Sequence, residues 1–147
     1  MMLEKMMLDV NVPMYAAGKE HKYKKPCVWV MEEIAESRIQ AVIDTEIIQE
    51  VLYRYFAIRQ WKFAVSISRQ LMVIVPEVMT VSAEHMHVAV DLFEEYGPAG
   101  IPPRDMLHAA VMILGDVKKI ISTDSHFNQI EGIERVDPLD LYNRKDD

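Results

Sequence analysis

Apolar residues follow two different spacings along this chain, and the two spacings alternate. From Thr45 to about Gln60, apolar positions recur three or four residues apart, which is the spacing of one helix face. Further helices are predicted near residues 11–17, 26–35, 63–71, 83–96 and 103–114. Short runs rich in Val, Ile and Met lie between these segments and predict buried strands near residues 6–10, 38–43, 78–81 and 119–122.

Helices that alternate with short apolar strands are typical of an α/β domain. We therefore predict a three-layer α/β/α sandwich with a mainly parallel central sheet. No repeat or long polar linker divides the chain, so we expect one domain over residues 1–141 and a frayed tail over residues 142–147. In such a sheet the functional crevice lies beyond the carboxyl ends of the strands, and that edge is the first place to search for a site.

Composition narrows the classes of protein that fit. The chain of 147 residues has 16 Lys and Arg against 23 Asp and Glu, a net charge of −7, which argues against holding nucleic acid by overall charge. The single cysteine, Cys27, excludes an intrachain disulfide and a thiolate zinc site. The longest apolar run, residues 106–114, is far shorter than the ~20 residues of a membrane span. We expect a cytoplasmic protein.

One segment is strongly basic. Residues 19–25 carry four lysines and a histidine, and the pattern predicts a loop. A solvated loop is the ordinary interpretation, and a rim that faces RNA is the alternative.

Four acidic residues lie at junctions between predicted elements, at positions that can reach the same edge of the sheet: Asp9, Glu50, Asp105 and Asp124. Alone, each has an ordinary structural role: Asp9, Asp105 and Asp124 suit helix starts, and Glu50 suits an ion pair with Arg54. Together they would repel one another unless a cation offset their charge. A set of oxygen ligands without His or Cys favours Mg²⁺ or Mn²⁺ over zinc.

Four motifs resemble the PIN-domain ribonucleases, a family that includes the VapC toxins of prokaryotic toxin-antitoxin pairs. They are LDVNV at residues 8–12, TEIIQEVLYRY at 45–55, PPRDMLHAAVM at 102–112 and IISTDSHF at 121–127, followed by IERVDP at 133–138. Each motif alone is weak, but their order and spacing cover nearly the whole chain.

The resemblance implies roles for particular residues. The four acids of the family match Asp9, Glu50, Asp105 and Asp124, and its polar supporting positions match Asn11 and Thr123. Many members have a second Asp where this chain has His126, which leaves the fourth acidic position to Asp124. Glu46, one helical turn before Glu50, is a competitor for the helical role.

What the resemblance implies is cleavage of RNA phosphodiesters by an endoribonuclease that uses Mg²⁺ or Mn²⁺ and no side-chain nucleophile. The four acids would hold the metal, and the candidate RNA contacts are Lys22, Lys24, Lys25 and Arg104. A homodimer and a protein antitoxin are the implied partners. A homodimer would also cover the large apolar residues near one predicted helix end, which are Phe56, Ile58, Trp61 and Phe63.

Two other functions fit parts of the pattern. The same fold could serve mainly to bind a partner, and a small protein encoded beside this one would favour that hypothesis. A phospho-acceptor receiver domain would need an acidic pair after the first strand, whereas Val10 and Asn11 follow Asp9.

His108, one turn from Asp105, is expected to be a hydrogen-bonded core histidine, with a contact to Asp105 as the alternative.

Overall fold

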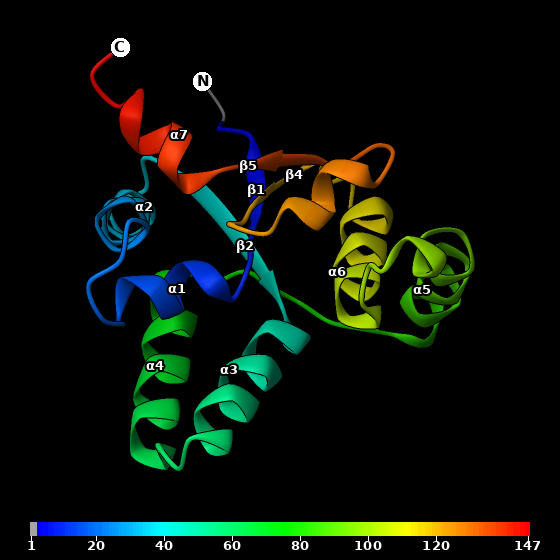
Figure 1. Ribbon diagram of the computed structural model, residues 1–147, viewed down its shortest axis with the longest axis horizontal. Helices are drawn as coiled ribbons and strands as arrows, with labels where there is room; N and C mark the ends of the chain where they lie inside the picture. The colour runs from blue at the N-terminus through cyan, green and yellow to red at the C-terminus, as the bar shows by residue number, and fades with distance from the viewer. Residues whose placement is uncertain (1–2) are drawn as a thin grey trace.

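The computed structural model describes residues 3–147 as a parallel sheet with helices on both faces (Figure 1). Five strands lie in the order β3-β2-β1-β4-β5, and every neighbouring pair is parallel. They are β1 (Lys5–Leu8), β2 (Gln40–Asp44), β3 (Val78–Met79), β4 (Lys119–Ile121) and β5 (Glu134–Val136). The predicted three-layer sandwich with a parallel sheet is confirmed.

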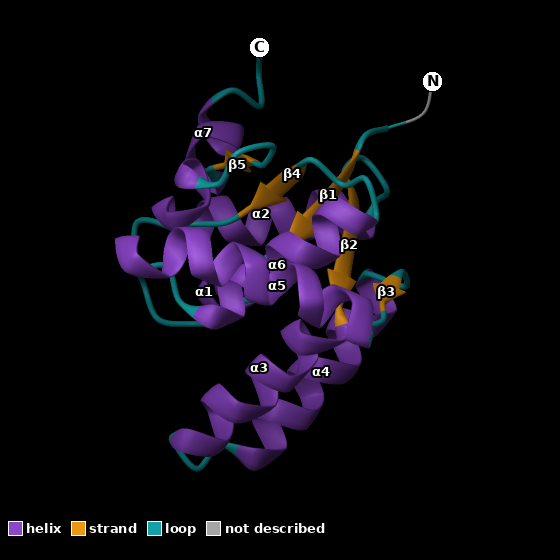
Figure 2. Ribbon diagram, turned by 90° about the vertical axis from the view of Figure 1, so that its right-hand side faces the viewer, coloured by secondary structure: helices purple, strands orange, loops and turns teal. Residues whose placement is uncertain are grey.

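The helices divide between the two faces of the sheet. One group comprises α1 (Asn11–Ala16), α2 (Lys24–Ala35), α3 (Thr45–Ala57), α4 (Trp61–Ile74) and α7 (Pro138–Asn143). The other face is covered by α6 (Pro103–Leu114), with α5 (Ala83–Tyr96) packed against it. The described residues also form the 3₁₀ turns η1 (Gly97–Ala99) and η2 (Ser125–Gln129). Helices α3 and α4 form a hairpin that projects away from the sheet (Figure 2).

Adjacent residues of the central strands pack into two separate hydrophobic cores, one on each face of the sheet. Successive side chains of a strand point to opposite faces, and the register of β1 places Met7 beside both Val42 and Ile120. These three residues pack against α6, whereas the next residue of β1, Leu8, belongs to the core under α1 to α4. All four side chains are fully buried. The short apolar runs in the sequence therefore mark strands that are covered on both sides.

Three stretches differ from the sequence-based expectation. Lys24 and Lys25 begin α2 instead of extending the basic loop, and the Lys24 ammonium donates to the Gly18 carbonyl oxygen at 2.6 Å. A solvent-facing first turn tolerates lysines, so charge alone did not distinguish it from a loop. Strand β5 was not among the predicted strands, because its three residues are too few to show an alternation of apolar and polar positions. Helix α7 includes Tyr142, the first residue of the tail that was expected to be frayed, and the ring of Tyr142 lies edge-on to Trp29.

Among residues 3–147, no helix is long and apolar enough to span a membrane.

The central strands should account for much of the stability. We expect Ile120→Ala in β4 to lower the free energy of unfolding by about 2–5 kcal/mol, because Ile120 is fully buried and truncation leaves a cavity. Val73→Ala on α4 is the control, since Val73 is 80% exposed, and it should change stability by less than about 0.5 kcal/mol. Urea unfolding measures both. Equal effects of the two changes would contradict the assigned sheet.

Candidate active site

The strand order places the site at one point of the sheet edge. The chain runs from β1 outward to β2 and β3, then returns to build β4 and β5 on the other side of β1. The loops after β1 and β4 therefore diverge, and such a switch point opens a crevice at the carboxyl edge. Asp9 follows β1, and its backbone N–H donates to the Ile121 carbonyl oxygen at 3.0 Å. Asp124 follows β4 in the neighbouring loop.

The carboxylate of Asp9 is held by three donors. The Ser122 hydroxyl donates to Oδ2 at 2.7 Å, and the Asn11 amide donates to the same oxygen at 3.1 Å. The Val10 backbone N–H donates to Oδ1 at 2.8 Å. Burial raises the pKa of Asp9 despite these bonds, because removal from water disfavours the charged form. Asp9 is thus fixed in orientation, and burial disfavours its charged form.

The loop after β4 is held by backbone contacts and by Arg135. The Thr123 backbone N–H donates to the Asn11 side-chain oxygen at 3.2 Å. The Arg135 guanidinium donates to the carbonyl oxygens of Ser122 and Thr123, each at 3.0 Å. Thr123 was expected to orient the acids, but the hydroxyl that bonds Asp9 belongs to Ser122. Sequence reasoning missed Ser122, although its place at the end of β4, beside β1, was a usable signal.

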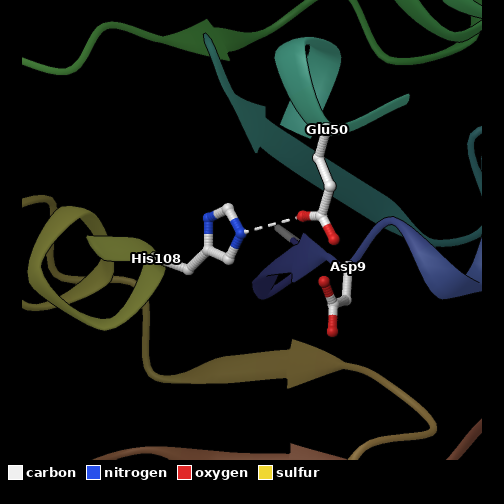
Figure 3. Close-up of side chains that lie close together, drawn as sticks. All are labelled: Asp9, Glu50 and His108. Atoms are coloured by element: carbon white, nitrogen blue, oxygen red, sulfur yellow. Dashed lines mark ion pairs between the residues drawn. The ribbon is translucent and has the colours of Figure 1, made fainter. Parts of the chain in front are cut away.

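Glu50 enters the site from the second turn of α3 (Figure 3). Its Oε2 lies 3.1 Å from an Arg54 nitrogen and 3.4 Å from an Arg104 nitrogen. Burial disfavours the charged carboxylate, but the nearby His108 and the two arginines outweigh it and lower the pKa of Glu50. Glu46 lies half-buried one turn earlier, in a groove that Val81 and Arg104 also line. Of the two glutamates, Glu50 is the one that lies with Asp9 and His108.

His108 is buried in α6 and joins two carboxylates. Its Nδ1 lies 2.7 Å from Oδ2 of Asp44, and its Nε2 lies 3.7 Å from Oε1 of Glu50. The expected core histidine is confirmed, with Asp44 as its hydrogen-bond partner rather than Asp105. Burial opposes the charged imidazole, but the two carboxylates outweigh it and raise the pKa of His108 well above its usual value. Asp44 directly precedes α3 in the chain, and sequence reasoning missed its contact with His108.

A second cluster adjoins the first. Asp105, Asp124 and His126 bring ligand atoms within 4.8 Å of one another, as do Asp9, Glu50 and His108 in the first cluster. The His126 Nδ1 lies 3.2 Å from Asp105 and 3.0 Å from Asp124. Burial and the charges of Asp9 and Asp124 raise the pKa of Asp105 to about 6. Asp105 responds to both of those charges, and the charge of Glu50 in turn raises the pKa of Asp9. The four acids therefore form one electrostatic system.

The candidate RNA contacts lie in two places. Arg104 belongs to the site through its pairing with Glu50. Lys22 and Lys25 are exposed near the start of α2, and Lys24 is half-buried. Closer to the acids, a cleft of about 470 Å³ is lined by residues that include Tyr15, Arg54 and Asp124.

The donor set fits a divalent cation. Carboxylate oxygens gather at the edge with two imidazoles. Among residues 3–147, the buried Nε2 of His108 has no hydrogen-bond partner. Fold and site together define a parallel α/β domain with a carboxylate-lined centre suited to such an ion. The chain belongs to the PIN domain family, and the sequence model of that family matches residues 6–133.

Named relatives extend the comparison. The chain is 29% identical over 130 residues to VapC ribonuclease Mb1869c of Mycobacterium bovis and to ribonuclease VapC13 of Mycobacterium tuberculosis. Each alignment covers 88% of this chain and 98% of the relative. Among solved structures, VapBC2 from Rickettsia felis bound to a promoter DNA fragment matches with a TM-score of 0.70 and 19% identity. That match covers 90% of this chain and 97% of the solved chain, and it supports the fold.

The raised pKa of Asp105 predicts a pH effect on metal-free protein. Its pKa is about 6 in the folded state against 3.8 for the unperturbed group, so the folded protein retains a proton that the unfolded chain releases. Stability should therefore fall as pH rises from about 4 to 6, by at most about 3 kcal/mol. Asp105→Asn should remove this slope and be the more stable protein above pH 6. Urea unfolding in EDTA across this range measures it, and parallel profiles would contradict it.

Proposed function

We propose that this protein is a metal-dependent endoribonuclease that hydrolyses phosphodiester bonds in RNA. The observation that carries the proposal is the gathering of Asp9, Glu50, Asp105 and Asp124 into two adjoining clusters at the switch point of the sheet. Ordinary helix caps do not need to converge from four elements. The VapC ribonucleases among the relatives support the same activity.

The four acids would hold Mg²⁺ or Mn²⁺ as direct or water-mediated ligands. A bound divalent cation would neutralise charge on the scissile phosphate and lower the pKa of an attacking water. The chain itself supplies orientation. Ser122 and Asn11 fix the Asp9 carboxylate, and Arg54 and Arg104 hold Glu50. No side chain needs to act as a nucleophile.

RNA binding must be local in a protein with a net charge of −7. Arg54 lines the cleft beside Asp124, and the half-buried Tyr15 offers a ring on which a base could stack. Lys22, Lys24, Lys25 and Arg104 remain the proposed phosphate contacts. Single-stranded RNA suits this arrangement, because its unstacked bases reach a shallow cleft.

Asp124→Asn separates the metal role from the cap role. The Asp124 Oδ1 accepts from the His126 backbone N–H at 2.9 Å, and an Asn oxygen would keep that bond. We therefore expect the variant to fold and, in EDTA, to be more stable than wild type because repulsion within the cluster is relieved. Added Mn²⁺ should raise the melting temperature of wild type much more than that of the variant. RNA cleavage should fall by about 100-fold or more, since even outer partners of a metal site cost 10–100-fold.

Asp91→Asn on the exposed face of α5 is the matched control for loss of one carboxylate. It should leave cleavage and the Mn²⁺ effect unchanged. EDTA-insensitive cleavage, or no cleavage of structured and unstructured RNAs with Mn²⁺, would count against the nuclease.

A protein antitoxin is the proposed partner. One structural relative is a toxin-antitoxin complex from Klebsiella pneumoniae, which matches with a TM-score of 0.64 and 18% identity. In this chain an apolar groove of about 320 Å³ between α1, α2 and α4 offers a surface for such a partner, with Val28, Met31 and Ile67 among its lining residues. A small protein encoded beside this one that co-purifies with it would identify the antitoxin.

We also propose a homodimer formed through the tip of the α3–α4 hairpin, meaning Phe56, Ile58, Trp61 and Phe63. These side chains are 39–61% exposed, which is much apolar surface for one corner of a monomer. Sedimentation at micromolar concentration should give a dimer, and Phe56→Asp should dissociate it. Val73→Asp, at an exposed position far along α4 from the tip, is the control. A monomeric wild type would remove the proposal.

A further inference from the structure

One buried atom at the site is left unexplained by the hydrogen bonds of the fold. The Nε2 of His108 is fully buried and has no hydrogen-bond partner within the part of the chain that the structure describes. An ion pair with Glu50 does not satisfy it, because the 3.7 Å separation exceeds hydrogen-bond range. An unsatisfied buried polar atom is costly, so its persistence calls for a ligand.

The opposite side of the ring has the geometry of a metal-binding histidine. Such a histidine usually donates its second ring N–H to a carboxylate, which fixes both the tautomer and the ring orientation. Nδ1 of His108 lies 2.7 Å from Asp44 and donates there, and a divalent cation at Nε2 would replace the proton on that nitrogen and bind its lone pair. Asp44 is itself fixed, since its other oxygen accepts from the Ile47 N–H at 2.9 Å.

The ring faces the two carboxylates that would complete the site. Figure 3 shows the imidazole of His108 directed toward Glu50, with Asp9 beside them. Two ligand atoms each about 2.1 Å from one ion lie between about 3.0 Å apart at a right angle and about 4.2 Å apart on opposite sides. The 3.7 Å from Nε2 to Glu50 falls inside this interval.

We propose that His108 is a nitrogen ligand of a divalent metal ion shared with Asp9 and Glu50, and that Asp44 orients the ring. This inference rests on the proposed metal site and deepens it. The sequence indicated an all-oxygen ligand set, whereas the fold brings an imidazole from α6 into the cluster. A nitrogen ligand favours Mn²⁺ and later transition metals over Mg²⁺, which prefers oxygen ligands and retains its waters.

Electron spin-echo spectroscopy of the Mn²⁺-loaded protein tests the ligand directly, because it detects a nitrogen nucleus bonded to the ion. We expect a ¹⁴N coupling in wild type that is replaced by ¹⁵N coupling when the protein is grown with ¹⁵N-histidine. His126→Gln and His87→Gln should both keep the coupling, whereas His108→Gln should lose it. The isotope experiment with His126→Gln needs no change in the core, so it stands even if His108→Gln fails to fold.

Metal affinity gives an independent measurement. Asp44→Asn retains an oxygen that accepts from Ile47, but its amide N–H₂ then faces Nδ1 as a donor and favours the ring form with the proton on Nε2. The variant should therefore weaken Mn²⁺ binding on the order of 10- to 100-fold. Mg²⁺ binding should change much less. Asp91→Asn is again the control. An equal loss of affinity for Mn²⁺ and Mg²⁺ would overturn the proposal that His108 is a nitrogen ligand.

The outcomes separate this inference from the nuclease. RNA cleavage with bound Mn²⁺ but no histidine coupling would overturn the role of His108 and leave the nuclease intact. Coupling that disappears only in His126→Gln would assign the nitrogen to the cluster of Asp105, Asp124 and His126, and would also overturn the role of His108. A persistent coupling in a protein that cleaves no RNA would support the ligand and reject the nuclease.

Discussion

Repulsion among carboxylates is the constraint on which the rest of this site depends. Burial is the largest cause of the raised pKa of Asp105, and the charges of Asp9 and Asp124 raise it further. The parallel sheet creates this crowding, because its strands deliver the residues that follow them to one edge. Everything else around the site can be understood as a response to that accumulated negative charge.

The response differs between the two clusters. Around Glu50, two arginines and His108 supply positive charge, and the pKa of Glu50 falls. Around Asp9, the neutral donors Ser122 and Asn11 fix the carboxylate, but burial outweighs them and raises its pKa. The edge thus holds one acid that is stable as an anion beside others that remain unfavourable without a further cation. This asymmetry is a physical reason why a divalent cation would be favoured there.

The sequence predicted the residues whose position follows from the chain locally. Asp9 and Asp124 come directly after strands, and Asp105 begins a helix after a Pro-rich loop, so their place at the edge follows from alternation alone. His108 and Asp44 are 64 residues apart, and only the packing of α6 against β2 joins them. Ser122 and Thr123 show how precise a prediction from the sequence would have to be, because they are neighbours with different roles. The Ser122 side chain donates to Asp9, whereas Thr123 donates through its backbone N–H to Asn11.

Asp44 shows why fold and site cannot be separated in this chain. One of its oxygens caps α3, the helix that carries Glu50, and the other holds His108 on α6. A single buried carboxylate therefore fixes two of the three members of the first cluster, from helices that lie on different sides of the sheet edge. Since α3 begins directly at the end of β2, the angle at which Glu50 meets His108 is set by that strand. The geometry of the first cluster thus depends on β2 through Asp44, its last residue.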